Sequence, residues 1–308
     1  MRKALIEVHA PVGRSDPQAV FMANSLCDLG WEVRLIQCLH PDTGYTTPEG
    51  FLDERIEVFS HAPINPMWAR SALIEYALIC SSHIEAWNPD VFVAYDFAGQ
   101  LCISNVRSRR MQNTQMMIMQ LETLSYTSRF FDSGCYNVIA DAWANSIVVY
   151  PECNRLVHDS KIMAGIGGAP KKFEVLPPSV PRTKLTELDT LEARKHEIGN
   201  PSQRVECTIA YAGSVVEETY ILEFLDSIRK MDTIPGINLR ILIAGPVGSS
   251  IENQFHYLVN AIPGAQYLGM LNQNQVAELI SGSHFSFIGW KPLDENFFYC
   301  APHTFIQS

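Results

Sequence analysis

Short apolar runs alternate with longer amphipathic stretches along most of the 308-residue chain. The first such run is ALIEV at 4–8, followed by DPQAVFMANSLCDLG at 16–30 with apolar residues at helical spacing, and then by EVRLIQ at 32–37. Asp16-Pro17 suits the start of a helix, and Gly30 suits the left-handed residue that ends one. This order predicts a strand, a helix and a second strand.

The same alternation continues through residue 178. Strands are expected at 56–60, 90–96, 115–122, 146–151 and 173–178, and a helix is expected at 69–87. Near-continuous apolar strands are typical of a parallel sheet that helices cover on both faces. Residues 1–182 are therefore expected to form a Rossmann-like domain.

The composition changes between residues 177 and 206, where proline and charged residues replace core residues as in a linker. The alternation then starts again, with strands expected at 207–213, 238–245, 265–271 and 284–290 and helices at 217–231 and 274–283. Residues 183–308 are expected to form a second Rossmann-like domain. This α/β domain is expected to be incomplete, because the closing helices of a doubly wound sheet do not appear before Ser308.

Composition and charge narrow the class of protein. No apolar run is long enough to span a bilayer, and a net charge of -10 argues against a nucleic-acid groove, which needs clustered Lys and Arg. The one basic run, RSRRMQ at 107–112, is interpreted as a solvated helix face. The eight cysteines show no zinc-ligand spacing and are expected to be reduced core residues. With no secretion signal at the N-terminus, a cytoplasmic location is expected.

Glycine-containing turns follow three of the expected strands. Gly13 lies in HAPVGRSDP, Gly213 in AGSVVEE and Gly245 in AGPVGSS. The helix N-terminus after such a turn favours an anion, and two facing Rossmann-like domains would bring these turns to one cleft. Each glycine can equally serve a tight turn without a ligand, although two equivalent turns in one sheet favour ligand binding.

The other sequence motifs do not indicate a particular class of enzyme. AGIGGAP at 164–170 follows a helix rather than a strand, so it does not meet the context of a dinucleotide fingerprint. The chain has no H-E-x-x-H, G-x-S-x-G or P-loop string. An NAD(P)-dependent enzyme is disfavoured because G-x-G-x-x-G after a strand is absent as well.

Several segments occur in an order that resembles the GT-B glycosyltransferases, closest to the retaining family 4. They are QAVFMANSLCDLGWEVRLI, NPDVFVAYD, DAWANSIVVYPECNRLV, FEVLPPSV, TIAYAGSV, LRILIAGPVG, YLGMLNQNQVAELISGSHFSFIGW and ENFFYCAPHTF. The resemblance implies a hexosyltransferase-type enzyme of polysaccharide biosynthesis. The second domain would hold a nucleotide-sugar donor, and the first would hold a saccharide or lipid-linked acceptor. The resemblance implies no metal ion or other cofactor. It leaves peripheral membrane contact open.

The resemblance also implies site residues. Asp96 and Glu122, at strand ends facing the cleft, are the catalytic candidates. The donor-binding candidates are Gly13, Gly213 and Ser214 for the phosphates, Gly245 and Pro246 for the nucleotide pocket, Gly269, Met270 and Leu271 for the base, Glu295, Asn296 and Tyr299 for the sugar, and Gln307 at the place of a ribose-binding glutamate.

This chain departs from the family in charge. Members generally carry an Arg and a Lys after the glycine of the AGS turn, because transfer requires neutralising a departing nucleoside diphosphate. Here the stretch is VVEETY, whose two carboxylates would repel a diphosphate. Leu121 replaces the family's histidine before Glu122, and Gln307 brings no charge. The alternative is therefore a GT-B-like protein with decayed chemistry that binds glycans or partner proteins.

Overall fold

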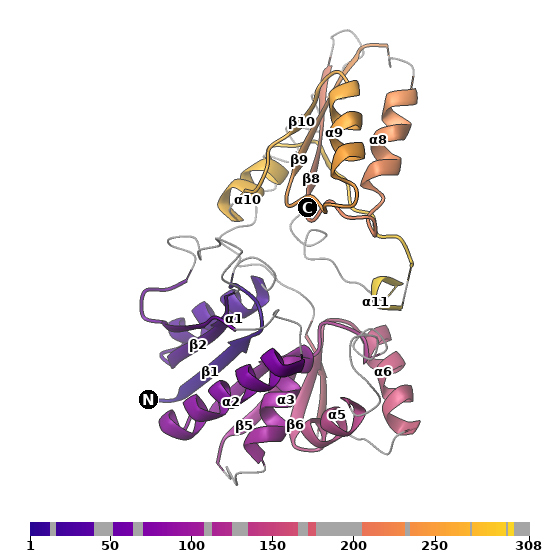
Figure 1. The fold of residues 1–308 in the computed structure, drawn as a ribbon. Coiled ribbons are helices and arrows are strands. Elements are labelled where there is room, and N and C mark those ends of the chain that lie inside the picture. Colours follow the sequence, from indigo (N-terminus) through magenta and orange to yellow (C-terminus); the bar gives the residue numbers. More distant parts are fainter. Residues whose placement is uncertain are drawn as a thin grey trace. The chain divides into compact units, whose positions relative to one another are not determined.

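The fold is that of a computed structural model of the chain (Figure 1). The structure describes residues 1–12, 17–39, 52–63, 70–107, 113–124, 135–165, 172–176, 205–231, 235–271, 273–293 and 295–298. The chain divides into two compact units, Met1–Pro178 and Ser179–Ser308. The expected boundary between residues 182 and 183 falls outside the described residues.

The first unit is built around a parallel sheet of seven described strands in the order β3-β2-β1-β4-β5-β6-β7. The strands are β1 (Lys3–Val8), β2 (Glu32–Cys38), β3 (Glu57–His61), β4 (Val91–Tyr95), β5 (Gln115–Met119), β6 (Ser146–Tyr150) and β7 (Lys172–Val175). The described helices are α1 (Pro17–Asp28), α2 (Arg70–Trp87), α3 (Asp96–Arg107), α5 (Cys135–Trp143) and α6 (Cys153–Gly165). The strand order reverses between β1 and β4, which is the topological switch point of a Rossmann-like sheet.

Both faces of this sheet are buried. Leu5 belongs to a core cluster with Tyr76 of α2, and its neighbour Ile6 belongs to a second cluster with Ala19 of α1. Successive side chains of a strand point to opposite faces, so helices must cover each face to exclude water. This arrangement explains why the strands are nearly continuous apolar runs.

The second unit repeats the plan with four described parallel strands in the order β10-β9-β8-β11. The strands are β8 (Val205–Ala212), β9 (Ile237–Ala244), β10 (Ala265–Tyr267) and β11 (Phe285–Ser286), and the helices are α8 (Ile221–Lys230), α9 (Glu252–Ala261), α10 (Gln273–Ser281) and α11 (Glu295–Phe298). Leu225 of α8 and Phe255 of α9 pack with Ile241 and Ile243 of β9 in a separate core. The strand order reverses here between β8 and β11.

The predicted fold class, two parallel Rossmann-like sheets, is confirmed, but several element boundaries were wrong, including the strand expected at 284–290, which is only Phe285–Ser286. The strand expected at 115–122 ends at Met119. The helix expected at 217–231 begins at Ile221, because residues 213–220 form a loop that makes bridges to neighbouring segments. The strand expected at 265–271 ends at Tyr267, two residues before the left-handed Gly269.

Two further expectations concern the cysteines and the membrane. All seven described cysteines are free thiols; six are buried and Cys153 is exposed. None of the described helices combines the length and the apolar character that crossing a bilayer requires.

Candidate functional site

Asp96 lies at the switch point of the first sheet, directly after β4. Its φ of 46° is left-handed, which is uncommon for a residue with a side chain. The β1–β4 ladder ends at the pair Ile6–Val93, and beyond it the Glu7 carboxylate accepts a hydrogen bond from the N–H of Tyr95 at 2.8 Å. The chain therefore turns sharply from β4 into α3 and places Asp96 at the carboxyl end of β4.

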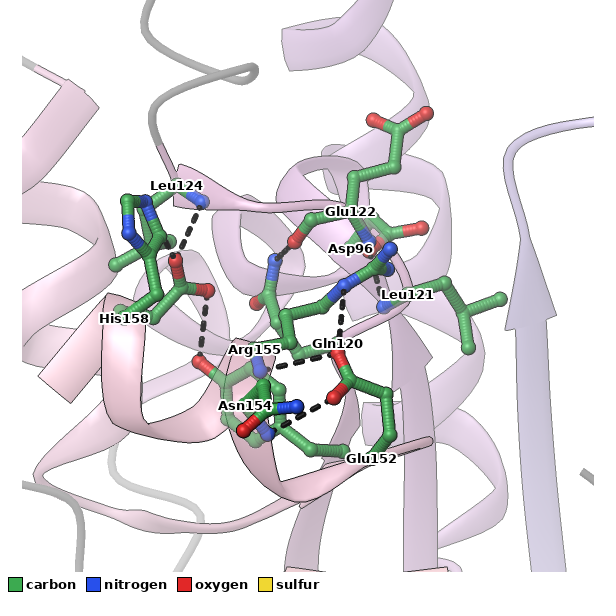
Figure 2. Close-up of polar contacts among 11 residues, drawn as sticks. Asp96, Gln120, Leu121, Glu122, Leu124, Glu152, Asn154, Arg155 and His158 are labelled. Carbon is green, nitrogen blue, oxygen red and sulfur yellow. Dashed lines mark hydrogen bonds and ion pairs between the residues drawn. The ribbon is translucent and has the colours of Figure 1, made fainter. Parts of the chain in front are cut away.

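The carboxylate of Asp96 holds the turn that follows β5. Its Oδ1 accepts hydrogen bonds from the N–H groups of Leu121 at 2.7 Å and Glu122 at 2.9 Å (Figure 2). Burial raises the pKa of Asp96 to about 6, although the two backbone bonds and the Arg155 charge act in the opposite direction. Asp96 thus joins two strand ends that are far apart in sequence.

Two more bonds fix the same turn. The Gln120 side-chain amide donates to the carbonyl oxygen of Glu122 at 2.6 Å, and the N–H of Leu124 donates to Asp159 Oδ1 at 3.1 Å. The side chain of Glu122 points away from the other labelled residues (Figure 2). The structure thus brings the two catalytic candidates together, with Asp96 turned inward and Glu122 turned outward.

Helix α6 contributes residues that the sequence analysis missed. Glu152 caps its first turn by accepting from the N–H groups of Asn154 at 2.8 Å and Arg155 at 3.0 Å. Arg155 and Asp159 are buried, at 3% and 0% exposure. Positions 152, 155 and 159 share one helix face, and this spacing of charged residues is the signal that could have revealed them.

Asp159 is the most buried carboxyl of this group. It accepts from the hydroxyl of Tyr150 at 3.0 Å as well as from the backbone of Leu124. Burial raises its pKa to about 7, against the opposing effects of these hydrogen bonds and of Arg155. The turn after β5 is therefore attached to α3 on one side and to α6 on the other, which fixes the position of Glu122.

In the second unit, three glycine turns lie side by side at the carboxyl edge of the sheet. Gly213 N–H donates to the Ala244 carbonyl at 3.0 Å, and Gly245 N–H donates to the Gly269 carbonyl at 2.9 Å. The ladder of the sheet thus continues beyond the strands. The predicted donor-binding residues that these turns bring together are Gly213, Ser214, Gly245, Pro246, Gly269, Met270 and Leu271.

Close backbone packing explains the glycine at 245. Its φ is 132°, and a Cβ there would overlap the carbonyl of Gly213. Two tyrosines close the turns, since Tyr211 donates to the Ser214 carbonyl at 2.6 Å and Tyr267 donates to the Gly245 carbonyl at 2.7 Å. The result is a rigid surface of main chain at which Ser214 is exposed.

Two of the remaining candidate site residues lie in a described helix, and three do not lie in the described residues. Glu295 and Asn296 open the short helix α11, a separate element after β11. Gly13, Tyr299 and Gln307 lie outside the described residues.

A hollow of about 340 Å³ occurs at the start of β10, lined by Asn238, Leu239, Arg240, Gly264, Ala265 and Gln266. These residues belong to the amino half of β9 and to the start of β10 with the residue before it. Ligands of open α/β sheets bind beyond the carboxyl ends, so this hollow is not part of the candidate site.

No protein-family model and no curated protein matches the chain. Solved structures do match it. Sucrose-phosphate synthase from Thermosynechococcus elongatus is 12% identical, with 93% of this chain and 75% of that chain covered and a TM-score of 0.62. HepE from Anabaena in complex with UDP and glucose is 12% identical, with coverages of 93% and 73% and a TM-score of 0.59. An Escherichia coli trehalose-6-phosphate protein bound with UDP-2-fluoro glucose is 10% identical, with coverages of 88% and 73% and a TM-score of 0.58.

These solved structures are GT-B glycosyltransferases, and at this level of identity the likeness establishes the fold. The chain therefore has the GT-B combination of two Rossmann-like units, as the resemblance in sequence predicted. Membership of family 4 stays a prediction.

Proposed function

We propose that this chain is a glycosyltransferase that binds a nucleotide-sugar donor on its second unit. The observation that carries the proposal is the set of three mutually bonded turns at the carboxyl edge of the second sheet. Open α/β sheets bind ligands at this edge, and backbone N–H groups there suit phosphate oxygens. The UDP and UDP-2-fluoro glucose of two similar structures support this choice of donor.

The proposed roles follow the two units. On the second unit, Gly213 and Ser214 meet the diphosphate, Gly245 and Pro246 line the nucleotide, and residues 269–271 meet the base. Glu295 and Asn296 are assigned to the transferred sugar, which we expect to be a hexose. Glu122 of the first unit is assigned to substrate contact and Asp96 to holding its turn in place.

The finer features of the reaction come from the resemblance in sequence. We propose transfer to a saccharide or lipid-linked acceptor with retention of anomeric configuration, without a metal ion or other cofactor. A cytoplasmic role in polysaccharide biosynthesis is the setting that this chemistry suits.

Titration of the purified chain with UDP, GDP and ADP tests the donor site. Saturable one-to-one binding of at least one of these nucleotides by calorimetry is expected, followed by release of sugar from the corresponding nucleotide-sugar. Absence of binding for all three would contradict the proposal and favour the alternative of a glycan- or protein-binding GT-B fold.

The Glu122→Gln variant separates binding from transfer. Because Glu122 belongs to the first unit, nucleotide affinity should be unchanged, whereas turnover should fall by about 100-fold or more. Glu174→Gln, at an exposed position in β7, is the matched control and should behave as the wild type. Full turnover by Glu122→Gln would contradict a role of Glu122 in the reaction, and it would not affect the proposal of a donor site on the second unit.

A further inference from the structure

The carboxyl edge of the second sheet is acidic where an anionic donor is proposed to bind. The loop at 213–220 carries Glu217 and Glu218 and has no Lys or Arg. Glu223 follows in the first turn of α8. A diphosphate placed here would meet several like charges, so a cation from another segment is required to offset them.

The described residues of this unit contain four Lys or Arg side chains, and three lie elsewhere. Arg229 and Lys230 are in the last turn of α8, which runs back towards the amino edge of the sheet. Arg240 lies in the amino half of β9 and pairs with Glu206 at 3.6 Å. Lys291 is the one described Lys or Arg at the carboxyl edge.

Backbone contacts place Lys291 beside the acidic loop. Its N–H donates to the carbonyl of Glu218 at 2.7 Å, and the adjacent Trp290 forms a bridge with Thr219. The preceding Phe287 stacks on Phe224 of α8 with ring centroids 4.3 Å apart. Because β11 pairs with β8 at the point where strand order reverses, Lys291 flanks the switch point of the second sheet.

The side chain of Lys291 is held close to the start of α8. Its Nζ lies 2.6 Å from Glu223 Oε1 and 6.0 Å from the ring of Tyr220. The Lys291 side chain is 16% exposed, whereas that of Glu223 is 53% exposed. An ammonium group has three N–H donors, so it can keep Glu223 and also donate to a phosphate oxygen.

We propose that Lys291 is the cation that binds the diphosphate of the donor and that Glu223, its ion-pair partner, opposes the phosphate by its negative charge. The inference rests on the proposed function and names the residue that supplies charge to that site. Lys291 reaches the loop from a segment about 70 residues further along the chain. It thereby offsets the carboxylates that the loop itself carries.

Two variants that break the same ion pair give opposite expectations. Lys291→Gln should weaken binding of the nucleoside diphosphate that the wild type binds by about tenfold, because a charged hydrogen bond to phosphate is lost. Glu223→Gln should tighten binding by about twofold or more, because a nearby negative charge is removed. Both variants are titrated by calorimetry as full chains at low and high salt, and Lys291→Arg should keep most of the affinity.

Lys230→Gln is the matched control. Lys230 lies in the last turn of α8, at the opposite end of the helix from Glu223, and pairs with Asp226. Like Lys291→Gln, the variant removes one positive charge and one ion pair of α8. Its affinity should stay within about twofold of the wild type, because charges beyond about 10 Å are screened by salt.

The outcomes separate the two proposals. Equal weakening by Lys291→Gln and Glu223→Gln would show that the pair only stabilises the loop, and unchanged affinity in Lys291→Gln would also overturn the inference. If Lys291→Gln does not fold, the sign of the effect in Glu223→Gln decides. A wild-type chain that binds none of UDP, GDP and ADP contradicts the proposed function itself.

Discussion

Two carboxyls, the partly buried Asp96 and the buried Asp159, organise the turn that presents Glu122. Asp96 and Asp159 together accept the N–H groups of Leu121, Glu122 and Leu124. Burial raises their pKa values to about 6 and about 7. The folded protein therefore keeps protons on these groups at pH values where the unfolded chain has lost them.

The first unit is expected to lose stability as the pH rises from 4 to 8. Groups with a raised folded-state pKa stabilise the fold fully below the unfolded pKa of about 4. This contribution is lost as the pH passes through about 6 for Asp96 and about 7 for Asp159. Each carboxyl adds a slope of up to about 1.4 kcal/mol per pH unit. Asp159→Asn cannot ionise and keeps an acceptor for Leu124, so urea unfolding at several pH values should show a shallower slope.

Asp226→Asn provides the control for this experiment. Asp226 lies on α8 with its side chain 34% exposed, and hydrogen bonds from Lys230 and Arg229 lower its pKa. Removing it should leave the slope between pH 5 and 8 unchanged. Identical slopes for the wild type and Asp159→Asn would show that Asp159 is already ionised in the folded protein at pH 5.

At the scale of elements, the donor side depends on how three turns pack on one another. Gly245→Ala would place a Cβ against the backbone of Gly213 at a φ that alanine rarely adopts. We expect a loss of about 1–3 kcal/mol in unfolding free energy of the second unit, because backbone rather than a flexible side chain must move. Chemical denaturation measures the loss, and nucleotide affinity should fall with it.

Gly248→Ala is the comparison within the same turn. A Cβ there would lie 3.4 Å from Cγ1 of Val216, which is ordinary contact. This variant should be close to neutral. Equal stability of the two variants would mean that the turns are not as closely packed as the structure has them.

The elements themselves could be predicted from sequence because their strands are apolar runs, buried on both faces in the first sheet and packed against one core in the second. Their ends could not. Strand β5 ends at Met119, after which the carboxylate of Asp96 accepts the N–H groups of the next turn. Helix α8 starts late because Thr219 pairs with Trp290. Both contacts join residues that are distant along the chain and leave no local pattern.

The same limit applies to the candidate site. Gly213 and Gly245 stand out in sequence because tight turns after strands need glycine. Asp159 and Lys291 do not stand out, since each acts on a segment that only the fold brings near. Charged residues spaced along one helix face, as in α6, are the pattern most worth searching for.

At the scale of the whole molecule, each unit has its own hydrophobic core. The first sheet is buried between two clusters, one containing Tyr76 and the other Ala19, and the second unit has a separate cluster around Phe255. Independent cores favour independent unfolding of the two units.

We therefore expect two transitions in differential scanning calorimetry, and each can be assigned by a different perturbation. Gly99→Ala should lower the transition of the first unit, because a Cβ there would overlap Glu7 Oε1 and the Ala94 side chain. The nucleoside diphosphate should raise the transition temperature of the second unit only. At a hundredfold excess over Kd, it adds about 2.7 kcal/mol to the unfolding free energy of that unit. A ligand that raised both transitions equally would show that donor binding is shared by the two units, and a single transition moved by both perturbations would show that the cores unfold together.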